Sequence, residues 1–339
     1  MNHESIAKGI LGGIIDRYIA DIAVDPNRSI RKLVDMAERT SDGPTQKICY
    51  QMMQQMAADE SSPYYEMIHH LVTGVSPETI RCFGINLGHN AWTFGSGHVR
   101  KISEDRNVSI PWAVLVDRRI DPKRIPFSEI SDLAARGRAM DIYGWLILCG
   151  DALDEWDAYA ELFRAHDDCV FGLCVSPQAL RDEIIEEAVE IRNLMILVET
   201  DGENWQEAAE KLARSQCLFS VYRTVRDESS AAEVTGGDWF EEIVPFYPLM
   251  AFTLTADDCP EAVAAEIQRY MWQSRLDQVC PVLPGDLISD FLLISRLVSH
   301  REVFYRVETD GSVSEGKGLH FVPGKLRCRD LFCAEVPAE

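Results

Sequence analysis

Residues 112–117, WAVLVD, begin a series of six short apolar runs, and this series decides the fold. The other runs are YGWLILC (143–149), CVFGLCV (169–175), LMILVET (194–200), CLFSVYR (217–223) and LMAFTLT (249–255). Their starts lie 31, 26, 25, 23 and 32 residues apart. Runs that are apolar throughout are typical of strands covered on both faces, and most of the intervals carry amphipathic helix patterns. The chain therefore predicts repeated right-handed βαβ units.

Six such units predict an α/β fold with a partial (β/α)6 TIM-like barrel over residues 106–300, with a doubly wound sheet as the alternative. Residues 1–105 carry helix patterns and no β-rich run, which predicts a helical N-terminal segment. In residues 301–339, Asp310-Gly311 within VFYRVETDGSV predicts the turn of a small C-terminal β-hairpin appendage.

The intervals between the runs differ in how clearly they predict helices. Residues 205–212 place their apolar side chains on one helical face, and Pro260 is expected to open a longer helix. Ser176-Pro177 is expected to form the N-cap and first turn of a helix that reaches Ile191. Residues 227–239, DESSAAEVTGGDW, predict turns instead of a helix.

The composition restricts the class of partner and the compartment. The chain has 339 residues, with 33 Lys and Arg against 55 Asp and Glu, so its formal net charge is −22. An acidic surface repels phosphate backbones, which makes nucleic acid and anionic membranes poor partners. No apolar run approaches the roughly 20 residues that span a bilayer. Several of the ten cysteines lie in apolar runs, where they act as small hydrophobes, so a reducing cytoplasm is expected.

Ligands of parallel α/β folds bind at the carboxyl ends of the strands. Here those ends carry Asp117, Asp151, Glu199, Asp201 and Arg223, which are expected to converge. Carboxylates at such positions act as general acids or bases, or alternatively as N-caps of the following helices. The candidates for catalysis are Asp117, Asp151 and Glu199. The residues expected to contact a ligand are Cys149, Gly150, Asp151, Ser176, Glu199 and Arg223.

Other motifs are sparse. Arg118, Arg119, Lys123 and Arg124 form a basic cluster that is either a solvated loop or a contact for an anion or a partner. No glycine-rich phosphate loop follows the first strand, and no CxxC or HExxH motif occurs. Cys328 and Cys333 are the only spaced thiol pair that suggests a metal, and two thiols alone do not make a site, so no metal is expected.

The stretch 86–117, NLGHNAWTFGSGHVRKISEDRNVSIPWAVLVD, resembles the entry to the barrel in a family of radical S-adenosylmethionine (SAM) proteins from anaerobic bacteria. The resemblance continues through most of the remaining chain. Residues 149–153, CGDAL, fall where that family has a GGEP-like motif after strand two. Residues 304–317, FYRVETDGSVSEGK, fall on its SPASM-like C-terminal hairpin. The resemblance implies a radical-SAM-like barrel with a helical lead-in.

The departures from the family pattern concern its iron–sulfur clusters. The family's CxxxCxxC loop after strand one supplies three thiolates to a [4Fe–4S] cluster that binds SAM. Here the loop Arg118–Pro126 contains no cysteine, and Glu315, Gly316 and Lys317 stand where a second cluster's cysteine is expected. In the GGEP-like motif, Cys149 replaces Gly, Asp151 replaces Glu and Ala152 replaces Pro. The resemblance therefore implies a degenerate member of the superfamily without the cluster motif.

Three functions follow as hypotheses. The first is a pseudoenzyme, a non-catalytic interaction or regulatory subunit with a protein partner such as an active radical SAM relative. The second is a binding module for SAM, another nucleoside or a small metabolite, so that residual SAM binding is kept although no cofactor is expected. The third is a cluster-free enzyme that uses the carboxylates of Asp117, Asp151 and Glu199.

Overall fold

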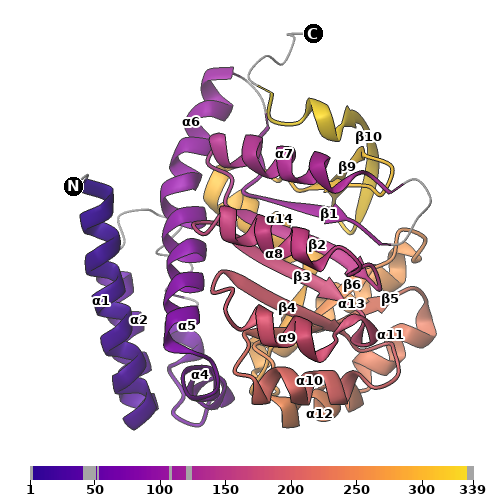
Figure 1. Ribbon diagram of the computed structural model, residues 1–339. Coiled ribbons are helices and arrows are strands. Elements are labelled where there is room, and N and C mark those ends of the chain that lie inside the picture. Colours follow the sequence, from indigo (N-terminus) through magenta and orange to yellow (C-terminus); the bar gives the residue numbers. More distant parts are fainter. Residues whose placement is uncertain (1–2, 41–50, 52, 107–108, 120–123, 334–339) are drawn as a thin grey trace.

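Serine–proline pairs define where two of the N-terminal helices, α4 (Pro63–Gly74) and α5 (Pro77–Gly84), begin. The computed structural model describes residues 3–40, 51, 53–106, 109–119 and 124–333. Ser62 and Ser76 accept hydrogen bonds from the backbone N–H groups of Tyr64 (3.3 Å) and Thr79 (3.1 Å), and Pro63 and Pro77 follow them as first helical residues. The helices of this layer, beside the sheet in Figure 1, are α1 (His3–Val24), α2 (Pro26–Thr40), α4 (Pro63–Gly74), α5 (Pro77–Gly84), the π-helix η1 (Ile85–Gly95) and α6 (Ser96–Arg106).

The π-helix η1 attaches this layer to the sheet. The side-chain amide of Asn86 donates to the carbonyl oxygens of Asp167 (2.7 Å) and Cys169 (2.9 Å), and Asn90 donates to Asp168 (2.8 Å). These carbonyls directly precede the third strand. Both amides are buried, so the bonds satisfy polar groups that would otherwise be costly and fix the helical layer against the amino ends of the strands.

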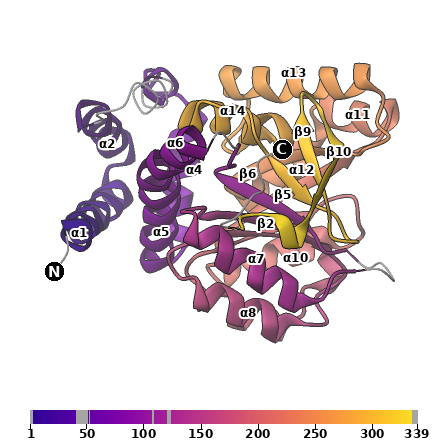
Figure 2. The ribbon, with the colours of Figure 1, turned by 90° about the horizontal axis from the view of Figure 1, so that it is seen from above.

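Ten strands form one sheet in the order β10-β9-β8-β1-β2-β3-β4-β5-β6-β7. The six apolar runs lie on its consecutive parallel strands, each paired with the next. These are β1 (Ala113–Asp117), β2 (Gly144–Gly150), β3 (Val170–Val175), β4 (Leu194–Glu199), β5 (Phe219–Val225) and β6 (Met250–Thr255). The protein is thus a mixed α/β fold with a curled, half-barrel sheet (Figure 2).

The strand count and the C-terminal arrangement differ from the sequence prediction. A seventh parallel strand, β7 (Leu283–Asp286), pairs with β6. Its sequence, LPGD, contains no apolar run. Proline is tolerated there because β7 lies at the edge of the sheet, where no further strand needs its N–H. The strands β8 (Tyr305–Val307), β9 (Ser312–Lys317) and β10 (His320–Arg327) extend the sheet from β1, since β8 pairs parallel to β1. They are therefore part of the half-barrel sheet and not an appendage packed against it.

Two helix predictions are corrected. Residues 227–239 form helices, α11 (Glu228–Thr235) and the start of α12, because Asp227 and Ser230 form a reciprocal capping box. Pro177 opens only the 3₁₀ turn η2 (Pro177–Ala179), and the α-helix begins later, at Asp182. The remaining helices are α7 (Phe127–Ala139), α8 (Trp156–Ala165), α9 (Asp182–Ala188), α10 (Trp205–Arg214), α12 (Asp238–Ile243), the 3₁₀ turn η3 (Val244–Phe246), α13 (Glu261–Asp277), α14 (Leu287–Ser299) and the 3₁₀ turn η4 (Cys328–Asp330).

Two apolar layers enclose the sheet. In Figure 2, α7 and α8 lie on one side of β1 and β2, and α14 lies on the other. On the inner side, Leu115, Leu146 and Leu197 pack in one buried cluster with Leu287 and Leu292 of α14. The interior of the half-barrel is therefore a packed core, and a ligand reaches the fold only at the ends of the strands.

None of the helices in the described part of the chain is long and apolar enough to cross a membrane.

Candidate functional site

Strand parity determines which side chains face the mouth of the half-barrel, the carboxyl end of its inner surface. Leu115, Leu197 and Tyr222 belong to the inner cluster, and side chains alternate between the two faces of a strand. Residues two positions further along therefore face the same side, at the end of each strand. This places Asp117, Glu199 and Thr224 around the mouth.

Arg119 lies across the mouth and pairs with Asp117. Its backbone N–H (3.2 Å) and Nε (3.0 Å) donate to Asp117 Oδ1, and its Nη2 donates to Oδ2 (2.6 Å). The Asp117 side chain is buried, whereas that of Arg119 is half-exposed. The hydrogen bonds to Asp117, and then the nearby charges of Asp117, Tyr222 and Asp257, raise the pKa of Arg119 against the effect of burial.

The stem of Arg119 also covers the end of strand β2. Gly150 has φ +54°, and a Cβ placed on it would lie 3.4 Å from Arg119 Cγ. A left-handed backbone favours glycine, which lets the arginine chain pass close to the strand end. Arg119 therefore occupies the space between the first two strand ends, and the sequence had placed it in a solvated or anion-contacting cluster.

The other arginines of that cluster face away from the mouth. Arg118 is buried and donates from Nη1 to the carbonyl of Ile125 (2.9 Å) and from Nη2 to Glu155. Arg124 pairs with Asp154, at 3.2 Å between Nη2 and Oδ2. These contacts hold the loop to the start of α8. Lys123 lies outside the described residues.

The segment that resembles the GGEP motif is hydrogen-bonded into the end of β3. The Ser176 hydroxyl donates to the carboxylate of Asp151, and the Ser176 N–H donates to the carbonyl of Gly150 (3.0 Å). Asp151 does not cap the following helix, since Glu155 is the residue at the N-cap of α8. Cys149 packs in the outer core, away from the mouth, and burial raises the pKa of its thiol to about 12. The structure thus brings Gly150, Asp151 and Ser176 together and places Cys149 apart from them.

Glu199 ends β4 and Asp201 follows it in the next loop, and both carboxylates are bonded by Thr224 of β5. Thr224 donates from Oγ1 to Glu199 Oε1 (3.4 Å) and from its backbone N–H to Asp201 Oδ2 (2.9 Å). Burial, with smaller contributions from neighbouring carboxylates, raises the pKa values of both acids. Asp201 does not cap α10, whose N-cap is Asn204.

Arg223 turns away from the inner surface. Its Nε lies 2.9 Å from Asp201 Oδ1, and its Nη2 pairs with Glu233 of α11. Tyr222, the preceding residue on the same strand, belongs to the inner cluster, so Arg223 points to the outer face. The predicted convergence of Arg223 with the mouth is therefore not seen.

Arg306 is a mouth residue that no sequence pattern predicts. It lies level with Leu115 on β8, and its guanidinium contacts Asp257 (2.6 Å) and Glu308 (2.9 Å) above the ring of Phe321. The bonds to these carboxylates raise its pKa although burial lowers it. No local signal predicts this role, because it depends on β8 pairing with a strand about 190 residues earlier in the chain.

The mouth as a whole is acidic and partly self-neutralised. The guanidinium groups of Arg119 and Arg306 are matched against four carboxylates. Three of these, Asp117, Asp257 and Glu308, form ion pairs. Among the described residues, Glu199 has no ion-pair partner of its own. This arrangement favours a cationic or zwitterionic group over a bare anion.

The residues at the mouth do not fit a [4Fe–4S] cluster. Such a cluster requires three thiolates close together, and the loop Arg118–Pro126 has none. In the hairpin, Glu315 pairs with Lys317, at 3.2 Å between Oε2 and Nζ. Within the described ranges, no group of three or more His, Cys, Asp or Glu side chains could hold a metal ion.

The remaining metal candidates lie apart from the mouth. Cys328 is buried against α7, with its Sγ 4.0 Å from the carbonyl oxygen of Glu129. The Sγ of Cys333 lies 3.1 Å from the carbonyl oxygen of Arg329. Both thiols contact backbone groups of separate segments.

Comparison with known proteins gives a likeness of fold only. No protein-family model and no curated protein matches the sequence. Crystal structures of Streptococcus suis SuiB are similar in three states. The S-adenosylmethionine-bound form has 8% identity and a TM-score of 0.48, the form bound to the precursor peptide SuiA has 9% and 0.48, and SuiB itself has 10% and 0.47. Each covers 64% of this chain, which spans 61–63% of the SuiB chain.

Proposed function

We propose that this chain is a non-catalytic, radical-SAM-like half-barrel that acts as an interaction or regulatory subunit. The observation that carries the proposal is the position of Arg119. It bonds Asp117 through three donors and covers Gly150, in the region where the resemblance puts a SAM-binding cluster. The polar groups of Asp117 and Arg119 satisfy each other's hydrogen bonds, so they stabilise the folded chain and leave no vacant position for a cluster that would perform radical chemistry.

The charge balance supports the same conclusion. A cluster or ligand at the end of β1 must displace Arg119, which leaves the buried carboxylate of Asp117 without its cation. Uncompensated buried charges are strongly destabilising. The loop offers no thiolate in exchange.

The free edge of the sheet supports a role in binding a protein. Strand β10 is the last strand in the order, and Val322 (43%) and Leu326 (39%) are exposed along it. An open edge presents unpaired backbone groups to which another chain can add a strand. Such a partner, for example an active radical SAM relative, would leave the mouth untouched.

Anaerobic reconstitution with iron and sulfide tests the proposal. The expected result is no stoichiometric four-iron cluster, by iron analysis and charge-transfer absorption, and no SAM cleavage. A four-iron cluster that cleaves SAM would overturn it. A second arm mixes the chain with an active radical SAM protein from the same source and measures the rate of that enzyme, which a regulatory subunit is expected to change.

Glu199 favours a second candidate function, the binding of SAM or another small cationic metabolite at the mouth. Its partly buried carboxylate is bonded weakly by Thr224, so a positively charged ligand group would supply the missing cation. Calorimetric titration with SAM and S-adenosylhomocysteine tests this. Binding of the cation SAM is expected to weaken in Glu199→Gln. The absence of any binding heat in the wild-type chain would refute the second candidate. Glu199 is also the best placed of the three predicted acids for acid–base chemistry, because Asp117 is ion-paired with Arg119 and Asp151 accepts from Ser176, whereas among the described residues Glu199 has only the long bond from Thr224.

A further inference from the structure

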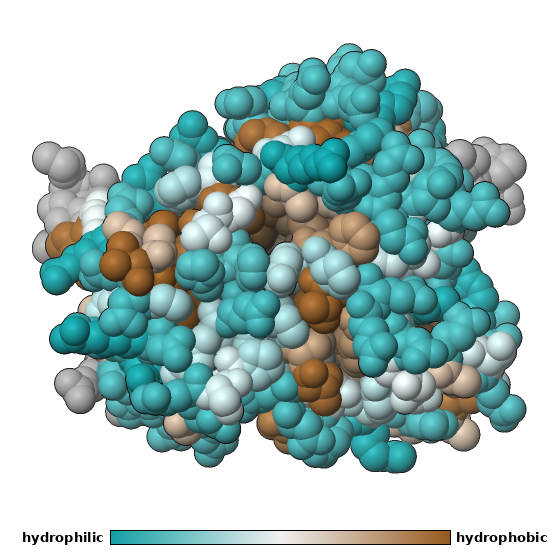
Figure 3. Space-filling view, turned by 90° about the horizontal axis from the view of Figure 1, so that it is seen from below, coloured by the Kyte–Doolittle hydropathy of each residue, from teal (hydrophilic) through white to brown (hydrophobic). Residues whose placement is uncertain are grey.

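A cavity of about 190 Å³ lies at the opposite end of the strands from the mouth. Its walls come from α4, from the segment between α10 and β5, and from the segment between η3 and β6. It therefore lies where the N-terminal helical layer meets the half-barrel. Figure 3 shows this underside of the molecule hollowed near its centre, with apolar atoms inside and hydrophilic residues around them.

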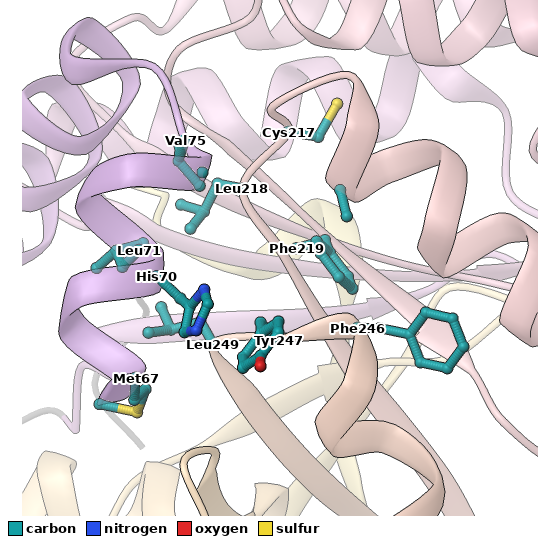
Figure 4. Close-up of a pocket in the computed structure, with 12 residues that line it drawn as sticks. Met67, His70, Leu71, Val75, Cys217, Leu218, Phe219, Phe246, Tyr247 and Leu249 are labelled. Carbon is teal, nitrogen blue, oxygen red and sulfur yellow. The ribbon is translucent and has the colours of Figure 1, made fainter. Parts of the chain in front are cut away.

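Aromatic rings form one wall of this cavity. The imidazole of His70 stacks on the ring of Tyr247, with centroids 3.5 Å apart and planes at 19° (Figure 4). Tyr247 has φ +53°, a left-handed conformation that is uncommon for a bulky residue, and this backbone turns its ring towards α4. Phe246, beside it, packs edge-on against Trp205 at 5.4 Å. The wall is thus held from both sides.

The lining selects for a neutral ligand. Among the described residues, those that line the cavity include no Asp, Glu, Lys or Arg, although the chain carries 88 charged residues in total (33 basic and 55 acidic). A charged ligand would lose its hydration here without gaining a partner. The polar groups available are the ring of His70, the hydroxyl of Tyr247 and the thiol of Cys217, whose pKa burial raises to about 12.

Of these groups, His70 offers a ring nitrogen that can accept a hydrogen bond from a ligand. Its Nε2 lies 3.7 Å from Glu66 Oε1, which is beyond hydrogen-bond distance. Burial lowers the pKa of His70 from its usual value, although Glu66 opposes the effect, and this favours the neutral imidazole, which has one acceptor nitrogen. The volume exceeds the about 150 Å³ of an engineered cavity that takes benzene.

We propose that this cavity is a binding site for a neutral, flat aromatic molecule of about the size of indole, bonded through an N–H or O–H to His70. Its rings would lie beside the His70–Tyr247 stack and above Phe219 and Leu249. The site is separate from the mouth, so it does not depend on the function proposed above.

Titration of the full chain with indole, followed by calorimetry, tests the site. We expect saturable binding with a dissociation constant of about 0.1 mM, well within the limit for so small a ligand. Gly74→Leu should abolish it, because Gly74 lines the cavity and a Cβ there meets no atom within 4 Å, so a leucine has open space in which to compete with the ligand. Gly84→Leu is the matched control, since Gly84 also ends a helix with open space around it.

The hydrogen bond is tested separately. His70→Phe keeps a ring against Tyr247 and removes the acceptor, so indole affinity should fall about three- to tenfold. Indene, which has the shape of indole without the N–H, should bind both chains equally. The proposal is overturned if wild-type protein shows no saturable binding at millimolar indole, if Gly74→Leu retains full affinity, or if Gly84→Leu loses as much. Gly74→Leu decides the matter should His70→Phe fail to fold.

Discussion

The ion pair between Asp117 and Arg119 is expected to stabilise the mouth of the half-barrel by a measurable coupling energy. The Asp117 side chain is 4% exposed and that of Arg119 is 49% exposed. Removing one partner of a fully buried pair costs about 3–5 kcal/mol, and an exposed pair contributes about 0–1 kcal/mol. With one partner buried and the other half in water, we expect Arg119→Ala to cost about 2 kcal/mol.

A double-mutant cycle isolates the pair from other effects of the substitutions. Asp117→Asn keeps an oxygen that accepts from the Arg119 backbone N–H, so it should cost about 1 kcal/mol. In the double variant the uncompensated carboxylate is gone, and the loss should be about 1.5 kcal/mol, which gives a coupling energy of about 1.5 kcal/mol.

Urea unfolding at pH 7, followed by tryptophan fluorescence and far-UV circular dichroism, measures these free energies where the two signals coincide. Arg214 and Glu210 on α10 provide the control cycle, since this exposed pair at i,i+4 should couple by only about 0.3–0.5 kcal/mol. A coupling energy for Asp117 and Arg119 no larger than that of the control pair would refute the reasoning. The mouth would then be held by packing alone, and the obstacle to a ligand there would disappear.

Three further changes have defined outcomes. Burial raises the pKa of Glu199 in the folded chain, so ionisation of this carboxyl opposes folding at neutral pH. Glu199→Gln should therefore raise the melting temperature at pH 7. The gain should vanish below about pH 4.5, where the carboxyl is protonated in both the folded and the unfolded chain, and melting curves across this range will show it. Gly172→Ala should lower the free energy of unfolding, measured in urea, by about 1–3 kcal/mol, since the added Cβ would lie 2.5 Å from Leu146 Cδ1 and 3.2 Å from Leu197 Cδ1. Gly13→Ala is the control. Gly13 has open space and a helical backbone, so this change should be neutral or stabilising. Trp239→Phe should cost about 2–3 kcal/mol, because it empties buried volume and removes the bond from Nε1 to Thr200 Oγ1 (3.0 Å); an unchanged urea midpoint would contradict the packing described for α12.

The parallel strands could be read from the sequence because burial on both faces makes a strand apolar along its whole length. Every residue of β1 and β3 is buried, which is what WAVLVD and CVFGLCV predict. Strand β7 has no such signature, since LPGD combines two residues typical of turns at the edge of the sheet. The helix α11 was missed for a different reason: Asp227 and Ser230 form a capping box with Ser in place of the usual Glu.

The candidate site was predictable only where a residue lies at the end of its own strand. Asp117 and Glu199 follow apolar runs directly, so their positions at the mouth follow from the topology. Arg306 belongs at the mouth through the pairing of β8 with β1. Strand parity turns Cys149 away from the mouth, although the resemblance places this residue in a ligand-binding motif. The local sequence does not determine which distant strands pair or in which direction a single side chain points.

The Asp117–Arg119 pair also determines what a ligand at the mouth must achieve. The pair forms between residues two apart in sequence, so it is complete without any ligand. A ligand that displaces the guanidinium gives up about 2 kcal/mol, which corresponds to about thirtyfold in dissociation constant. A cationic group that then takes the place of Arg119 should bind Arg119→Ala about thirtyfold more tightly than the wild-type chain, whereas a ligand held by Glu199 alone should bind both equally. Titration of the two chains with SAM therefore distinguishes a mouth closed by its own arginine from one that is open beside it.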